Sequence, residues 1–168
     1  MCIRDSLYTG ATTISAGTFK VTGALADTAL SVSSGATYDV DLSDAIGSIA
    51  GSGSIDLASG VTLTAGGSGD TEFGGVISGL GGFTKAGSGT TTLSGTNLYT
   101  GATTISAGTF KVTGALADTA LSVSSGATYD VDASDAIGSI AGSGSIDLAD
   151  SVTLTAGGSG DTEFGGVI

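Results

Sequence analysis

The sequence predicts an all-β protein, a right-handed parallel β-helix (solenoid) with short strands and glycine-rich turns. Three observations predict it: 31 glycines among 168 residues, short runs of threonine and β-branched residues, and a long internal repeat. Glycine occurs at more than twice its average share of roughly 7%, and proline is absent. Glycine allows the positive φ that sharp corners of a coil require.

The expected strands are short runs in which apolar and polar residues alternate between Gly or Ser boundaries. In order along the chain they are residues 12–15, 18–21, 30–32, 37–41, 54–57, 61–64, 71–73 and 90–93. In the second run, Phe19 and Val21 share one side of the strand, and Thr18 and Lys20 share the other. Residues 23–29 are the one helical candidate, and they are too few to hold a helix alone.

Residues 7–77 align without gaps on residues 98–168, and the two copies differ at three positions. The differing pairs are Leu42 and Ala133, Ser59 and Asp150, and Gly60 and Ser151. Such fixed-period similarity is typical of solenoids, in which each turn buries its apolar side against the next turn, ~4.8 Å away. At roughly twenty-odd residues per turn, one unit would make about four turns. We expect a first unit at residues 7–97 and a second, truncated unit at residues 98–168.

Residues 1–6 precede the repeat and do not fit it. Met1–Ser6 resembles the translation of a transposon-end adapter used in DNA library preparation, and the repeat begins directly after it. We therefore expect these six residues to be non-native. They contain the chain's one cysteine, so disulfide and thiol chemistry are not expected in the repeats.

The charge balance argues against several functions. Sixteen acidic and four basic residues give a net charge of −12, whereas nucleic-acid binding and electrostatic membrane attachment need basic surface. No apolar run approaches the ~18 residues of a membrane helix. We expect no nucleic acid, no cofactor and no membrane-spanning segment in this chain.

A long glycine-rich motif crosses the junction of the two units, at residues 81–112. It resembles the autotransporter-associated β-strand repeat, also called the passenger-associated transport repeat, whose pattern is G-G-x-T-K-x-G-x-G-x-x-x-L-S-G, N-x-Y-T-G, then T-x-I-x-A-G-T-L. Phe110 stands where the family usually has Leu, and the first unit retains the half of the pattern from Tyr8 onward. Residues 45–53 and 73–79 look like the usual spacers between such repeats. The matching residues are Gly81, Gly82, Thr84, Lys85, Gly87, Gly89, Leu93, Ser94, Gly95, Asn97, Tyr99, Gly101, Ile105 and Gly108.

The resemblance implies a structural, non-enzymatic stalk in the passenger of a type V secreted autotransporter. Such a protein is secreted or displayed on the surface of a Gram-negative bacterium and supports display or adhesion toward a surface or host ligand. An outer-membrane translocator barrel is expected at the C-terminus of the full-length chain. The physics agrees, because a solenoid folds by adding neighbours without external energy. Chains without cysteine and proline also avoid periplasmic cross-linking and slow isomerisation.

A calcium-stabilised secreted β-roll or adhesin repeat is the alternative function. Hard cations prefer oxygen ligands, and the sequence repeats a D-x-D-x-x-D pattern. The glycine and closing glutamate of an EF-hand loop are missing, so a solvated acidic surface is the preferred interpretation. Gly66–Asp70 is similar to a calcium-roll repeat, but its aspartate comes one position early. The candidate calcium ligands are Asp39, Asp41, Asp44, Asp130, Asp132 and Asp135.

An enzymatic function is a third hypothesis, based on paired carboxylates. Asp70 and Glu72, repeated as Asp161 and Glu163, could be the two acids of a glycosidase, which lie ~5–9.5 Å apart. Without histidine, and because the pair recurs with the repeat, we predict no catalytic residues. The threonines of residues 62–64 and 90–92 are interpreted as ordinary strand residues rather than a water-ordering array, and Lys85 as a strand-edge charge.

Overall fold

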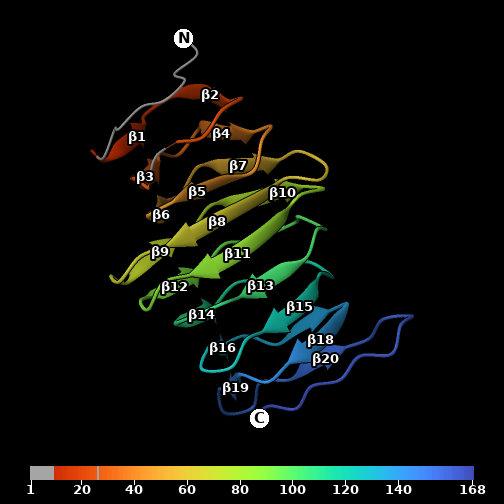
Figure 1. Ribbon diagram of the computed structural model, residues 1–168. Coiled ribbons are helices and arrows are strands. Elements are labelled where there is room, and N and C mark those ends of the chain that lie inside the picture. Colours follow the sequence, from red (N-terminus) through yellow and green to blue (C-terminus); the bar gives the residue numbers. More distant parts are fainter. Residues whose placement is uncertain (1–9, 26) are drawn as a thin grey trace.

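The computed structural model describes residues 10–25 and 27–168, which form a parallel β-solenoid of about eight turns (Figure 1). The described residues contain no helix, which confirms the predicted all-β fold and parallel stacking. Residues 23–25 and 27–29 form no helix, in agreement with the expectation that this segment is too short to hold one. Residues 1–6, assigned above to an adapter, lie outside the described residues.

The chain passes through three sheets in a constant order, and we call these sheets faces 1, 2 and 3. Face 1 is an eight-stranded sheet of β1 (Thr12–Ile14), β3 (Ala29–Val32), β6 (Ser48–Gly51), β9 (Thr71–Phe73), β12 (Thr90–Leu93), β14 (Thr109–Val112), β16 (Thr128–Val131) and β19 (Ser145–Leu148). Face 2 has four strands, β2 (Gly17–Val21), β4 (Ala36–Val40), β7 (Ser54–Leu57) and β10 (Val76–Gly79). Face 3 has six strands, β5 (Asp44–Ile46), β8 (Thr62–Gly66), β11 (Gly82–Ala86), β13 (Thr103–Ile105), β15 (Ala120–Val123) and β18 (Ser139–Gly142).

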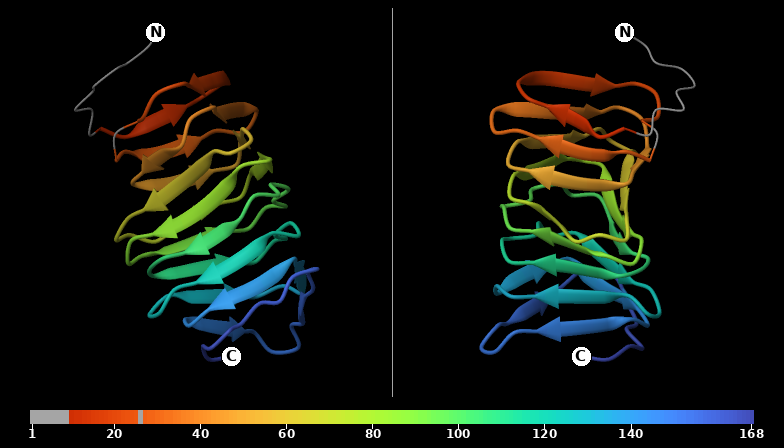
Figure 2. Two further views of the ribbon diagram at one scale, coloured as in Figure 1. Left: turned by 45° about the vertical axis from the view of Figure 1, so that its right-hand side comes forward. Right: turned by 90° about the vertical axis from the view of Figure 1, so that its left-hand side faces the viewer.

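The remaining two strands, β17 (Asp135–Ile137) and β20 (Leu154–Ala156), pair with each other. β17 lies along the chain between β16 of face 1 and β18 of face 3, and β20 follows β19 of face 1. The strands of face 2 occupy the same place in the order, so we assign both strands to face 2. Figure 2 shows the turns stacked in chain order from the N-terminal to the C-terminal end.

The core is built from columns of inward side chains, one residue per turn. On face 1 one column places like residues in register on successive turns: Phe73, Leu93, Val112, Val131 and Leu148. The first four of these are fully buried. Burial of each apolar side chain of this size stabilises the fold by roughly 1.5–3 kcal/mol. Each turn therefore gains its stability by stacking these side chains on those of the neighbouring turns.

Glycines at the corners allow successive turns to approach closely. Gly87 has φ +74°, and a Cβ at this position would lie 2.3 Å from the backbone nitrogen of Gly67 on the preceding turn. Gly108, with φ +67°, occupies the equivalent corner of the next turn and faces the Gly87 carbonyl oxygen in the same way. A side chain at either corner would separate the turns.

The turns vary in length. Register partners on face 1 are 17 residues apart at Val131 and Leu148 and 22 apart at Gly51 and Phe73. Four turns separate β1 from β12, and β13, the strand equivalent to β1 in the second unit, follows two faces later. The expectation of about four turns per unit is therefore too low.

Four strands of the first unit were not among the predicted ones: β5, β6, β10 and β11. Their sequences are rich in glycine and small residues, and in β11 the inward column includes Lys85, so the apolar–polar alternation is concealed.

Candidate functional site

Lys85 lies inside the solenoid, and its interpretation as a strand-edge charge is wrong. The residue is 1% exposed, and in the inward column of face 3 it stands between Ala65 and Ile105. Its Nζ donates to the carbonyl oxygens of Ala86 (2.7 Å), Gly87 (2.9 Å) and Ala107 (3.3 Å). Burial lowers the pKa of Lys85, and the charge of Asp70 opposes this shift. The ammonium group thus joins two corners on successive turns.

Asn97 occupies a turn where face 2 has no strand between β10 and β17. It is 1% exposed, and its Oδ1 accepts from the backbone nitrogen of Ile77, at 3.2 Å, on the preceding turn. Its Nδ2 donates to the carbonyl oxygens of Gly95 (3.2 Å) and Ala115 (3.3 Å), the latter on the following turn. The side chain therefore supplies hydrogen bonds that a strand backbone supplies elsewhere.

A buried chain of hydroxyl groups follows Asn97. The Tyr99 hydroxyl lies 2.7 Å from the Thr103 hydroxyl, which lies 3.2 Å from that of Thr119 on the next turn. The Thr119 hydroxyl in turn donates to the Gly101 carbonyl oxygen at 2.5 Å. Burial raises the pKa of Tyr99, so the phenol stays neutral and the chain ends on a backbone acceptor. This arrangement gives each of these buried hydroxyl groups a hydrogen-bond partner.

The aspartates of the D-x-D-x-x-D pattern do not converge. Asp39 and Asp41 point outward and form ion pairs with Lys20, at 2.9 and 2.6 Å. Asp44 points inward, where it accepts hydrogen bonds from the Tyr38 hydroxyl (2.7 Å) and the Leu25 backbone nitrogen (2.9 Å). Within residues 10–25 and 27–168, no three acidic, cysteine or histidine side chains are grouped to hold a metal ion. This geometry does not favour the calcium hypothesis.

The second unit repeats this separation with one difference. Lys111 pairs with Asp130 (2.8 Å) and Asp132 (2.6 Å), and Asp135 accepts from the Leu116 backbone nitrogen at 2.9 Å. The buried Tyr129 hydroxyl, equivalent to that of Tyr38, has no hydrogen-bond partner in the part of the chain that the structure describes. Burial raises the pKa of Asp44 and of Asp135.

The carboxylates considered for catalysis are engaged with the following turn. Asp70 accepts from the Thr90 backbone nitrogen at 2.8 Å, and Glu72 accepts from the Ser94 hydroxyl at 2.6 Å. Both contacts hold one turn against the next, so the pair is accounted for by stacking.

Comparison with known families agrees with this structural interpretation. Residues 5–21 and 83–112 match the model of the passenger-associated-transport-repeat family. These two segments are similar to passenger-associated transport repeats, which supports a passenger repeat region. No curated protein and no solved structure matched the chain.

The second match of the passenger-associated transport repeat covers β11 to β14 and includes Lys85, Asn97 and Tyr99. Of the motif residues that the resemblance implied, Leu93 and Ile105 are fully buried in inward columns, and Thr84 faces outward. The glycines stand where turns meet: a Cβ on Gly95 would lie 1.9 Å from the Gly75 carbonyl oxygen. The repeat motif is therefore a set of packing and hydrogen-bonding positions.

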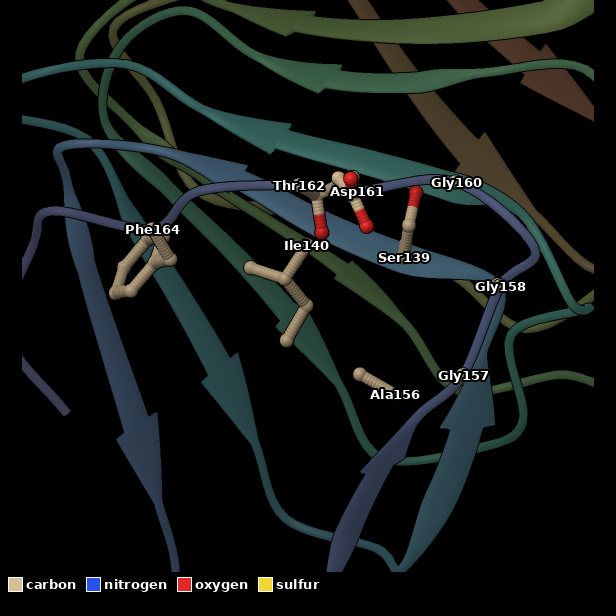
Figure 3. A pocket seen from close by; sticks show the side chains of 10 residues that line it. Ser139, Ile140, Ala156, Gly157, Gly158, Gly160, Asp161, Thr162 and Phe164 are labelled. Carbon is tan, nitrogen blue, oxygen red and sulfur yellow. The ribbon is translucent and has the colours of Figure 1, made fainter.

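Surface hollows near the repeats follow from the stacking. One of about 410 Å³ lies beside Ser139 and Ile140 and is bordered by Gly158, Asp161 and Phe164 (Figure 3). In the first unit, the turn equivalent to Gly158–Asp161 is covered by the next turn, as the contact of Thr90 with Asp70 shows. A second hollow, of about 270 Å³, lies beside the exposed Leu80, and Gly81, Gly82 and Gly101 are among the residues that line it.

Two further observations on the described residues bear on the sequence predictions. Thr64, Thr84 and Thr104 align in an outward column on face 3, a regularity that the spacing along the chain concealed. No helix in the described part of the chain is long and apolar enough to cross a membrane. The ladder-completing role of Asn97 was missed, and its one signal was a lone asparagine between glycine and tyrosine.

Proposed function

We propose that this chain is part of the structural stalk of an autotransporter passenger, exported across the outer membrane of a Gram-negative bacterium. It acts with a C-terminal translocator barrel in the full-length protein and holds a distal functional region, such as an adhesive one, away from the cell surface. The repeat family is structural, and the carboxylates considered for catalysis have structural partners. A stalk needs length and stiffness rather than a reactive site.

The observation that carries the proposal is the register of the parallel ladder. Paired strands lie on adjacent turns, 17 to 22 residues apart, as at Val131–Leu148 and Gly51–Phe73. A turn that emerges from a translocator can therefore fold on the turn that precedes it, without waiting for distant sequence. Each added turn buries apolar surface, and this free energy biases movement outward.

Two side chains of the repeat motif, Lys85 and Asn97, support the same proposal where the ladder has the fewest strand pairs. Face 2 lacks a strand between β10 and β17, and Asn97 connects Ile77 to Ala115 across this gap. Lys85 connects two corners just before it, through Gly87 and Ala107. Stepwise folding can thus continue through a turn that contributes little strand pairing.

The experiment places the chain between a signal peptide and an autotransporter translocator barrel in a Gram-negative host. Protease accessibility on intact cells measures how much of the chain reaches the surface. The native chain should be displayed, and Asn97→Ala should lower the displayed amount several-fold because it opens the ladder at Ile77. The exposed neighbour Thr96→Ala is the matched control and should be displayed normally.

Two results would count against the proposal. One is a native chain that stays in the periplasm although the barrel alone inserts. The other is equal display of the Asn97→Ala and Thr96→Ala variants when Asn97→Ala is shown to unfold more easily. The second result would show that export does not depend on stepwise folding of the turns.

A further inference from the structure

Equivalent strands of the two units lie on different faces. β1 belongs to face 1 and its equivalent β13 to face 3, while β2 and β4 belong to face 2 and their equivalents β14 and β16 to face 1. From β1 the chain returns to face 1 four times, at β3, β6, β9 and β12, and then advances two more faces to β13. One sequence unit therefore spans four and two-thirds turns.

The surface features of the unit move with the strands. The ion-paired cluster of Lys20, Asp39 and Asp41 starts on face 2, on β2 and β4. The equivalent cluster around Lys111 starts on face 1, on β14 and β16. The core tolerates the shift because inward columns on all three faces accept the same apolar residue types, so only the order of faces must be kept.

We propose that tandem copies of this unit form a three-faced rod in which each copy is turned by one third about the axis relative to the copy before it. Each surface cluster then appears on all three faces in succession, with an axial step of about 22 Å at ~4.8 Å per turn. It returns to its first face only after three units, or about 67 Å.

This geometry determines how a partner can use the repeats. A flat, rigid partner along one face meets a given cluster once in three units. A partner that surrounds the rod, or several partners that approach from different sides, meets every copy. The repeats therefore favour multivalent contact around the axis over a continuous stripe on one side, a property independent of the export route.

The test compares two distances that share one position. Ala45 on β5 and Ala136 on β17 are equivalent exposed residues of the two units, on faces 3 and 2. Ala141 on β18 lies in the same outward column of face 3 as Ala45, five turns away, or about 24 Å of axial rise. Spin labels on cysteines at each pair, in a Cys2→Ser background, give both distances by double electron–electron resonance.

The rotated arrangement predicts that the 45–136 distance is longer than the 45–141 distance, although its axial rise is smaller. Units stacked in phase predict the reverse order, and equal distances would also overturn the proposal. Ser31 with its equivalent Ser122, compared with Ser31 and Asp130 five turns away on face 1, provides a second set of labels. Circular dichroism checks that each labelled variant keeps the native fold. If one set of label positions changes the spectrum, the distances are measured with the other set.

Discussion

The Nζ of Lys85 lies 3.3 Å from the carbonyl oxygen of Ala107, so one buried ammonium group joins two successive corners of the solenoid. Lys85→Ala should lower the free energy of unfolding by about 2–4 kcal/mol, because it leaves buried carbonyls without donors and opens a cavity. Urea unfolding followed by circular dichroism measures this loss. Lys85→Met, which keeps most of the volume, should lose less.

The matched control for Lys85 is Lys111, which makes only surface ion pairs with Asp130 and Asp132. Lys111→Ala should cost less than about 1 kcal/mol, because partly exposed ion pairs contribute little. Equal losses at the two lysines would contradict the interior role of Lys85.

Asn97→Ala should expose the backbone nitrogen of Ile77 to exchange. The substitution removes the acceptor of that N–H, and an unsatisfied buried donor costs about 1–3 kcal/mol. Hydrogen exchange at Ile77 should accelerate more than exchange at Phe73, whose strand lies on face 1. Thr96→Ala should leave both rates unchanged, and slow exchange at Ile77 in Asn97→Ala would show that water or another group replaces the amide.

Tyr38 and Tyr129 are equivalent, but only Tyr38 donates its hydroxyl proton, to Asp44. Tyr38→Phe should destabilise the protein by about 1.5–3 kcal/mol, the range for hydrogen bonds to charged groups. Tyr129→Phe should be neutral or stabilising, because it removes a buried hydroxyl without a partner in the described structure. Thermal melts of the two variants give the comparison, and a reversed order would contradict the assigned hydrogen bonds.

Asp44 should make stability depend on pH. Burial raises its pKa above the ordinary value of 3.8, so the folded protein favours the protonated acid. The stability that this preference contributes is fully present below pH 3.8 and is lost as the pH rises through the folded-state pKa. Asp44→Asn should therefore flatten the fall in unfolding free energy as the pH rises above 3.8, as measured by urea titrations at a series of pH values. Asp147→Asn is the control: it removes the same charge at an exposed position and should leave the fall in unfolding free energy unchanged.

Ser151 has φ +67° where the first unit has Gly60 at φ +76°. Because this left-handed conformation costs a residue with a Cβ about 1–2 kcal/mol, Ser151→Gly should stabilise the protein and Gly60→Ser should destabilise it by similar amounts. A Cβ at Gly60 meets no atom within 4 Å, so crowding does not complicate the comparison. Stability changes of the same sign for both substitutions would contradict the backbone assignment.

Sequence reasoning could predict the strands with regular alternation, such as β4 and β7, because stacking then requires an apolar residue at every second position. It could not place Lys85, because its burial depends on carbonyl oxygens of two corners that only the folded coil brings together. It also grouped Asp44 with Asp39 and Asp41, because the corner that turns Asp44 inward, away from the other two, is formed only in the folded coil. The rotation of one unit relative to the next about the axis depends on the number of residues in each turn, and the 91-residue period alone does not give that number.

The three-faced construction also bears on how such proteins can change in length during evolution. A duplicated segment joins the rod without a break whenever it starts and ends at matching corners, even if it is not a whole number of turns. The 91-residue offset between Leu7 and Leu98 meets this weaker requirement. Duplication, insertion and loss therefore have three times as many permissible lengths as a coil that demanded complete circuits, and gene rearrangement can lengthen or shorten the protein with little penalty to folding.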